Sequence, residues 1–343
     1  MKPILVIKLG TASITDQLGN PEPETLGLIA SQVARLSSRF RILLVSSGAV
    51  GAGKKSIRQY KGTLVQKKAA AAIGNPILMT MYGEAFAQHG MAVAQTLCER
   101  GHFANRNQFL QLKATLQELW TSGVVPIANE NDVVSDVELK FSDNDELATL
   151  LAAGLGAEIL MLGTSVGAFL DGEGNRVPRL ARIDKEVWAM VRKEKSSLGS
   201  GGMVSKLSFA RRASQLGIPV VLFSASQPNG IQKALDGETG TWIDAAQVSR
   251  NERQRWLGTG SLISGKAHLD AGARAAVSER KSLLAVGILA VQGDFEVGEV
   301  IELLGPEGET FAIARTRLSK TELESLIGTP KMEVAHTDDI VVL

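Results

Sequence analysis

Continuous apolar runs of strand length recur through the first two thirds of the chain. Runs without polar alternation are typical of strands that are covered on both faces of a sheet. They lie at 4–7, 42–45, 91–97, 124–127, 159–162 and 218–223. Apolar residues at helical spacing lie between them, at 26–36, 109–119 and 207–216. This alternation predicts an α/β fold with a mainly parallel sheet sandwiched by helices.

The pattern changes after Phe223. A segment rich in Gly, Pro, Asn and Asp is followed by a charged stretch at 250–255. Short strand signals separated by turn residues then follow, at 283–291, 300–304, 311–314 and 340–343. We therefore expect two domains, an α/β domain over 1–255 and a small β-rich domain over 262–343.

Composition and charge narrow the class of protein. The 343 residues are 44% hydrophobic and carry a net charge of +1, so the chain as a whole is not drawn to nucleic acid or membrane surfaces. A single cysteine fits a reducing compartment, and we expect a cytoplasmic protein. The most hydropathic stretch, 147–170, is interrupted by Glu158, which argues against a membrane-spanning helix.

The loops after the strands are where a parallel sheet places its ligands. Lys8 ends the first predicted strand, and Gly10 follows it. A lysine at this position can stabilise charge on a transferring phosphoryl group, whereas the simpler alternative is a strand-end lysine that points into water.

A glycine-rich segment follows the second strand. Gly48, four residues, Gly53 and Lys54 nearly match a P-loop, but Lys55 stands where that motif needs Ser or Thr for magnesium. We favour Ser47 and Gly48 as a close-approach surface for a substrate. A tight strand-to-helix turn that merely needs glycine is the alternative.

Two clusters of amide and acid side chains follow the 124–127 strand. One contains Asp132 and the other contains Asn144 and Asp145. They could bind an ammonium group, orient lysines or hold Mg²⁺ through water. The alternative is a solvated acidic loop that caps the next helix.

A further glycine-rich loop, at 199–202, leads into a helix with Lys206 in its first turn. Backbone N–H groups at such a helix start can bind polyphosphate, although a flexible linker would have a similar composition. The four histidines lack the spacing of a metal site, so we assign no metal ligand.

Taken in order, these motifs resemble the amino acid kinase family, and within it the members that phosphorylate glutamate. The resemblance rests on VIKLGTAS, VSSGAVGAG, VPIANEND, SDNDELA and GSGGMVSK. The segment after 262 resembles a PUA domain, with DAGARAAVSERKSLLAVGI, GDFEVGEVIEL and VAHTDD.

The resemblance implies an enzyme that transfers the γ-phosphoryl group of ATP, with Mg²⁺, to the side-chain carboxylate of L-glutamate in the first step of proline biosynthesis. Proline is then the expected feedback inhibitor, and we expect a homo-oligomer. By family likeness, Lys8 and Lys206 neutralise the phosphoryl charge and Asp145 orients them. The expected substrate-binding residues are Ser47, Gly48, Asp132 and Asn144. The expected nucleotide-binding residues are Lys8, Gly10, Thr164, Ser165, Ser200, Gly201, Gly202, Met203, Val204, Ser205 and Lys206.

The chain departs from the family pattern at two places. Thr164-Ser165 stands where the family has Thr-Asp, which bears on the nucleotide pocket, and Gln111 replaces an asparagine. Three alternatives remain: a kinase for another carboxylate, a protein without turnover, and an RNA-binding protein. The last is disfavoured because residues 263–343 carry 8 Lys+Arg against 13 Asp+Glu.

Overall fold

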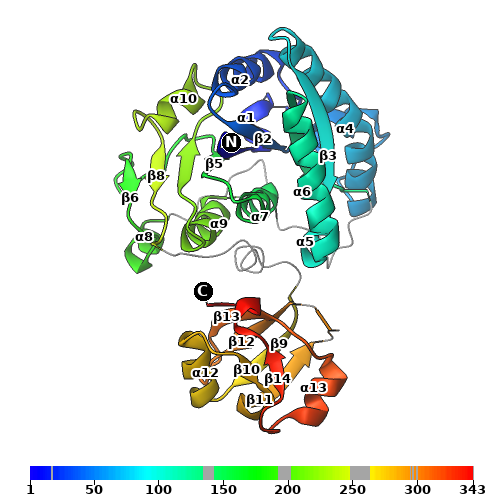
Figure 1. Ribbon diagram of the computed structural model, residues 1–343. Helices are drawn as coiled ribbons and strands as arrows, with labels where there is room; N and C mark the ends of the chain where they lie inside the picture. The colour runs from blue at the N-terminus through cyan, green and yellow to red at the C-terminus, as the bar shows by residue number, and fades with distance from the viewer. Residues whose placement is uncertain are drawn as a thin grey trace. The chain divides into compact units, whose positions relative to one another are not determined.

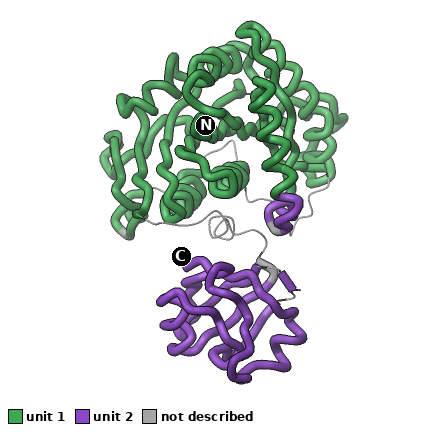
Figure 2. Tube along the Cα trace, viewed as in Figure 1, with its two compact units in different colours: residues 1–99, 110–247 green, residues 100–109, 248–343 purple. Residues whose placement is uncertain are grey.

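The computed structural model describes residues 1–16, 18–133, 143–191, 202–247, 263–293, 295, 297–298 and 300–342. It divides into two compact units, which Figure 2 shows in different colours. The first contains Met1–Glu99 and Leu110–Gln247, and the second contains Arg100–Phe109 and Val248–Leu343. The boundary predicted between 255 and 262 lies outside the described residues, and 1–255 with 262–343 stays a prediction.

An eight-stranded sheet forms the centre of the first unit, in the order β3-β4-β2-β1-β5-β7-β8-β6. Every pairing in it is parallel except that between β7 and β8. This confirms the predicted mainly parallel sheet. The strands are β1 (Ile4–Leu9), β2 (Arg41–Ser46), β3 (Ala92–Cys98), β4 (Val124–Glu130), β5 (Ile159–Gly163), β6 (Arg179–Leu180), β7 (Val220–Phe223) and β8 (Thr241–Ile243).

Helices cover both faces of this sheet (Figure 1). One face packs on α2 (Pro23–Leu36), α4 (Leu64–Ala87) and α10 (Gly230–Leu235), around a core that includes Leu5, Ile7 and Leu44. The other face carries α7 (Asn144–Leu155) and α9 (Met203–Gln215), which contact each other. The remaining helices described before the second sheet are α1 (Thr11–Ile14), α3 (Ala49–Gly53), α5 (Arg100–Ala104), α6 (Arg106–Thr121) and α8 (Lys185–Met190). Of these, α5 and the start of α6 belong to the second unit.

Helices α3 and α4 approach so closely that their contact has no room for a side chain. A Cβ added to Gly74 of α4 would lie 1.8 Å from the carbonyl oxygen of Ala49, and one added to Gly53 would lie 2.0 Å from that of Ala70. Both glycines are therefore needed for packing. Lys54, the lysine of the P-loop-like segment, donates through Nζ to the carbonyl oxygen of Leu18. Helix packing and the Lys54 hydrogen bond therefore explain why this segment is rich in glycine, and no bound phosphate is needed to explain it. This agrees with the poor match of the segment to a P-loop.

The second unit is β-rich, as predicted. Its five-stranded sheet has the order β11-β9-β12-β13-β15, and β10 pairs with β14 in a separate ribbon. The predicted strand at 283–291 is wrong as a single element, because a 3₁₀ turn at Ala285–Gly287 divides it. The elements are β9 (Ile263–Leu269), α12 (Ala271–Ser278), β10 (Leu283–Leu284), β11 (Ile288–Gly293), β12 (Val300–Leu304), β13 (Thr310–Arg315), α13 (Lys320–Leu326), β14 (Glu333–Ala335) and β15 (Ile340–Val342). Within the described part of the chain, no helix has the length and apolar character needed to cross a membrane.

Candidate active site

Polar side chains gather where β1, β2 and β4 end. The central strand β1 has β2 on one side and β5 on the other, and β4 lies beyond β2. All four strands run parallel, so their carboxyl ends meet at one edge of the sheet. Helix α7 begins above this edge and α9 packs beside it. The strand β4 extends to Glu130, so Asn129 and Glu130 are strand residues rather than the loop residues that the apolar run 124–127 suggested.

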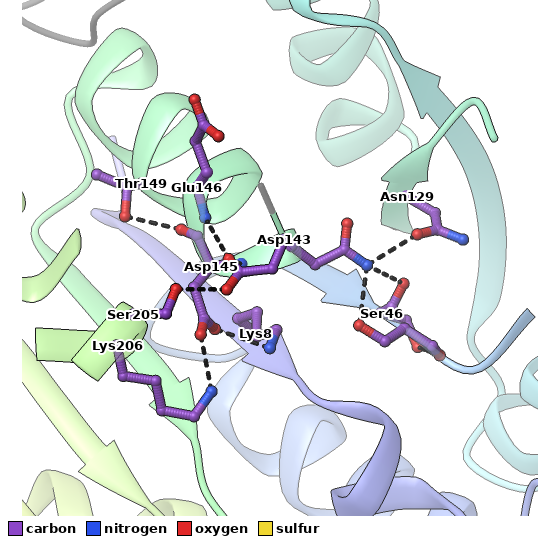
Figure 3. Close-up of polar contacts among 11 residues, drawn as sticks. Lys8, Ser46, Asn129, Asp143, Asp145, Glu146, Thr149, Ser205 and Lys206 are labelled. Carbon is purple, nitrogen blue, oxygen red and sulfur yellow. Dashed lines mark hydrogen bonds and ion pairs between the residues drawn. The ribbon is translucent and has the colours of Figure 1, made fainter. Parts of the chain in front are cut away.

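Three predicted residues, far apart in the sequence, form one buried ionic cluster. Asp145 Oδ1 lies 2.7 Å from Lys8 Nζ, and Asp145 Oδ2 lies 2.8 Å from Lys206 Nζ. Asp145 is 0% exposed, and the two lysines are 4% and 7% exposed. Figure 3 shows the two ammonium groups reaching Asp145 from different elements. The two ammonium groups share the single carboxylate of Asp145, and the charge of Asp143 also acts on Lys206.

The pKa values follow from this arrangement. Burial alone would raise the pKa of Asp145, but Lys8 and Lys206 outweigh burial and lower that pKa below its ordinary value. Burial and the charge of Lys8 lower the pKa of Lys206, whereas Asp145 raises it. Asp145 is therefore ionised at neutral pH and holds a proton on Lys206 that burial disfavours.

Asp143 connects the starts of two helices. Its Oδ1 accepts hydrogen bonds from the backbone N–H groups of Asp145 and Glu146, which caps α7. Its Oδ2 accepts a hydrogen bond from Ser205 Oγ in the first turn of α9. Ser205 and Lys206 thus lie beside the start of α7, and the helix cap fixes where Asp145 stands.

Asn144 lies in a second polar cluster. Its Nδ2 donates to Ser47 Oγ at 2.9 Å, to Asn129 Oδ1 at 2.9 Å and to the carbonyl oxygen of Ser46 at 3.2 Å. Figure 3 shows Ser46 and Asn129 on one side of Asp143, with Lys206 on the other. The start of α7 therefore separates a neutral amide and hydroxyl cluster from the ionic cluster.

Two predicted glycines shape the backbone around these clusters. Gly48 has a φ of 106°, which a residue with a side chain rarely adopts, and it is the N-cap residue of α3, directly after Ser47. At Gly10 an added Cβ would lie 3.4 Å from Lys8 Nζ, so the glycine leaves space beside that ammonium group.

The other predicted residues lie as follows. Asp132 is partly exposed in the turn two residues after β4 ends. Thr164 is buried directly after β5, where its N–H bonds the carbonyl oxygen of Phe223, and Ser165 beside it is exposed. Gly202 is the N-cap residue of α9, and Met203 and Val204 begin that helix. Ser200 and Gly201 lie outside the described residues.

Sequence reasoning singled out neither Asp143 nor Asn129, although one alternative expected the acidic loop to cap the next helix. Both stood in the clusters that were singled out, and a signal for each was available. Asp143 directly precedes an apolar helix, which is the position of an N-cap. Asn129 lies near the carboxyl end of a buried strand, where polar side chains meet the ligand edge.

No protein cage for a metal is seen in the described ranges, where no three His, Cys, Asp or Glu side chains gather to hold an ion. Both oxygens of Asp145 already face ammonium groups. The donor set fits a metal held mainly by phosphate oxygens rather than by this carboxylate.

Comparisons with known proteins agree with this geometry. Residues 3–224 match the model of the amino acid kinase family, and residues 265–337 match that of the PUA domain. A glutamate 5-kinase from Gloeobacter violaceus is 39% identical, over 99% of this chain and 99% of its own. One from Trichlorobacter lovleyi is 34% identical, over 98% of this chain and 94% of its own.

Solved structures share the fold of the first unit. The carbamate kinase from Giardia lamblia bound to AMP-PNP superposes with a TM-score of 0.52 at 19% identity, over 71% of this chain and 99% of its own. The UMP kinase from Ureaplasma parvum gives a TM-score of 0.50 at 14% identity, over 71% of this chain and 100% of its own. At these identities the likeness concerns the fold alone.

Proposed function

The chain belongs to the amino acid kinase family, and from this membership we infer that it is a glutamate 5-kinase, which makes L-glutamyl 5-phosphate from L-glutamate and ATP for proline biosynthesis. The curated relatives match along nearly the whole chain, PUA domain included. The observation that carries the inference is the buried cluster of Lys8, Asp145 and Lys206.

The chemistry of an acyl phosphate fits the groups present. An oxygen of the glutamate side-chain carboxylate attacks the γ-phosphorus, the bond from that phosphorus to the β,γ-bridging oxygen breaks, and ADP leaves. The carboxylate is already ionised at neutral pH, so the reaction needs no general base. What the protein must supply is in-line placement and charge neutralisation.

We assign charge neutralisation to Lys8 and Lys206, both of which hold their positions through Asp145. Their protonated ammonium groups can contact the oxygens of the transferring phosphoryl group, where negative charge spreads in the transition state. Asp145 is a positioning residue in this proposal, because both its oxygens face the lysines.

We place the nucleotide phosphates at the start of α9. Its first turn carries no acidic residue of its own, so its backbone N–H groups and helix dipole favour an anion. Gly202, Met203, Val204 and Ser205 would contribute there, with Gly10, Thr164 and Ser165 nearby at the ends of β1 and β5. Mg²⁺ would be carried by the phosphate oxygens and would add positive charge there.

We place the amino acid in the amide and hydroxyl cluster on the other side of α7. Ser47, Gly48 and Asn144 offer small groups and hydrogen-bonding atoms beside the ends of β2 and β4. Asp132 supplies a carboxylate for the α-ammonium group of glutamate. These roles are supported by the positions of the residues at the strand ends and by the hydrogen-bonding groups that they carry.

Several properties of the protein are proposals with their own tests. Proline inhibits the enzyme, which a titration of the rate with proline tests.

The chain forms a homo-oligomer in the cytoplasm, and exposed apolar side chains such as Val65 and Ile77 on α4 support assembly. Light scattering measures the oligomeric state. The acidic segment 263–343 does not bind RNA, which low-salt filter binding tests.

Hydroxylamine trapping tests the function directly. Mg-ATP and glutamate should yield γ-glutamyl hydroxamate with the unmodified protein, and Lys206→Ala should lower kcat by about 10²–10³-fold. Lys233→Ala, at an exposed site on α10, is the matched control and should behave as the unmodified protein. An undiminished rate in Lys206→Ala contradicts the mechanism. Hydroxamate with a different acid but not with glutamate would keep the kinase and reject the substrate.

A further inference from the structure

Helix α4 carries two buried polar side chains on its inner face. Asn75 and Tyr82 are 8% and 0% exposed, with the apolar Leu78 between them. A separation of seven residues places both side chains on one face of a helix. Because buried polar groups need partners, these two residues bind α4 to whatever it covers.

Their partners are the two strand ends that border the amide and hydroxyl cluster. The Tyr82 hydroxyl lies 2.8 Å from Ser46 Oγ at the end of β2. Asn75 Oδ1 accepts a hydrogen bond of 3.1 Å from Asn129 Nδ2 near the end of β4. One helix face therefore fixes both strands at the site edge.

Both strand ends converge on one amide group. Asn144 Nδ2 has two hydrogens, and the three oxygens within its reach belong to Ser46, Ser47 and Asn129. Because Nδ2 of Asn144 faces these three oxygens, Oδ1 of Asn144 points away from them. The residue is only partly buried, and no hydrogen-bond donor from the described ranges contacts that oxygen.

The orientation of each amide depends on the preceding one. Asn75 presents an oxygen, so Asn129 presents its nitrogen to α4 and its oxygen to Asn144. The backbone N–H of Glu130 supports the same orientation by donating to Asn129 Oδ1. A chain of hydrogen bonds thus runs from inside α4 to the partly exposed oxygen of Asn144.

We propose that Asn75 and Tyr82 are positioning residues for the acceptor amino acid, because they hold Asn144 with its carbonyl oxygen toward the α-ammonium group of glutamate. This inference rests on the proposed function. A carbonyl oxygen accepts from an ammonium group, whereas an amide turned the other way would present hydrogens to a cation.

The test separates the two ends of the substrate. Asn75→Leu removes the acceptor and should raise KM for glutamate about tenfold, with kcat and KM for ATP unchanged, because the lost contact is present before and during the reaction. Asn75→Asp keeps an acceptor oxygen and should restore KM. Tyr82→Phe removes only a hydroxyl and should raise the same KM about two- to tenfold. Thr80→Ala, at an exposed site of α4, is the matched control.

Glutarate, which is glutamate without its amino group, shows whether the ammonium group is involved. Its inhibition constant should be the same in Asn75→Leu as in the unmodified protein. Equal weakening of glutamate and glutarate would overturn the inference, since that result indicates general damage to the pocket. An unchanged KM for glutamate in both Asn75→Leu and Tyr82→Phe would also overturn it.

Failure of the proposed function gives a different result. The unmodified protein would then form no glutamyl hydroxamate, whatever the variants do. Calorimetric binding of glutamate then decides the inference, because Asn75→Leu must still weaken glutamate about tenfold and leave glutarate unaffected. A protein that binds no glutamate contradicts the function and the inference together.

Discussion

Gly74→Ala is expected to damage both stability and catalysis through a single added methyl group. The new Cβ would lie 1.8 Å from the carbonyl oxygen of Ala49, and ordinary contact begins at 3.4 Å. The α3–α4 separation must therefore grow by about 1.6 Å. Overpacking of this kind costs about 1–3 kcal/mol. Helix α3 begins two residues after Ser47. Because a misplacement of about 1 Å can cost about 10²-fold in rate, we expect a fall of that size in kcat/KM.

Gly83→Ala on the same helix provides the matched control. Nothing lies within 4 Å of a Cβ at Gly83, so this variant gains the helix propensity of alanine, about 0.5–1 kcal/mol, without the clash. The difference in the free energy of unfolding between Gly74→Ala and Gly83→Ala therefore gives the steric cost of the added methyl group.

Tryptophan fluorescence during urea unfolding measures that difference. Trp120, Trp188 and Trp242 lie in the first unit and report on it. Hydroxamate formation measures the rate. Equal midpoints and equal rates for Gly74→Ala and Gly83→Ala would refute the reasoning, since the contact would then have room for a methyl group.

The remaining predictions concern the ionic cluster and two helix caps. Asp145→Asn should lower the free energy of unfolding by about 3–5 kcal/mol, because two buried ammonium groups lose their counter-charge; an unchanged urea midpoint contradicts this. Burial and then Lys8 lower the pKa of Lys206, so a pH–rate profile should fall, as pH rises, through a value below the ordinary 10.5. The pH at which the rate falls should be lower still in Asp145→Asn, since Asp145 raises the pKa of Lys206. A rate that falls only at pH 10.5 or above argues against a role for Lys206 in this pH dependence. Asp143→Ala removes the cap of α7 and should cost about 0.5–2 kcal/mol in the same urea experiment, and an unaltered unfolding curve argues against the cap. Ser319→Ala breaks the capping box of α13 and should lower the calorimetric transition temperature of the second unit. Hydroxamate formation should stay unchanged, because the proposed site residues lie in the first unit, and a lower rate contradicts this expectation.

The parallel strands could be predicted because burial on both faces leaves continuous apolar runs, as in residues 4–7 of β1. Helix α4 could not be predicted in the same way. It is apolar on most sides and contains Pro76, so it lacks the periodic polar face that reveals a helix. The division between β10 and β11 was equally hidden, because the 3₁₀ turn at Ala285–Gly287 lies inside an apolar run. A Cβ added to Gly287 would lie 2.3 Å from the Cβ of Ala273, which the pattern does not reveal.

In the site, too, the sequence pattern predicted where single residues lie in their elements but not which residues meet in the fold. Pattern alone placed Lys8 and Lys206 at a strand end and a helix start, which are positions where charge can act. Their meeting at Asp145 depends on sheet topology. The acidic clusters offered orientation of lysines as one possibility, and the family resemblance named Asp145. The contact of Asn75 with Asn129 joins residues 54 positions apart through a helix that the pattern did not reveal.

The shared aspartate also bears on how the lysines would react with the product. An acyl phosphate is an acylating agent, and an unprotonated lysine amine beside it would be an efficient nucleophile. Burial and the charge of Lys8 both favour loss of the proton from Lys206, and Asp145 opposes that loss. An amine that keeps its proton has no lone pair with which to attack. Asp145 therefore does more than hold two lysines in place, since it also opposes formation of the unprotonated Lys206 amine that a reactive anhydride would acylate.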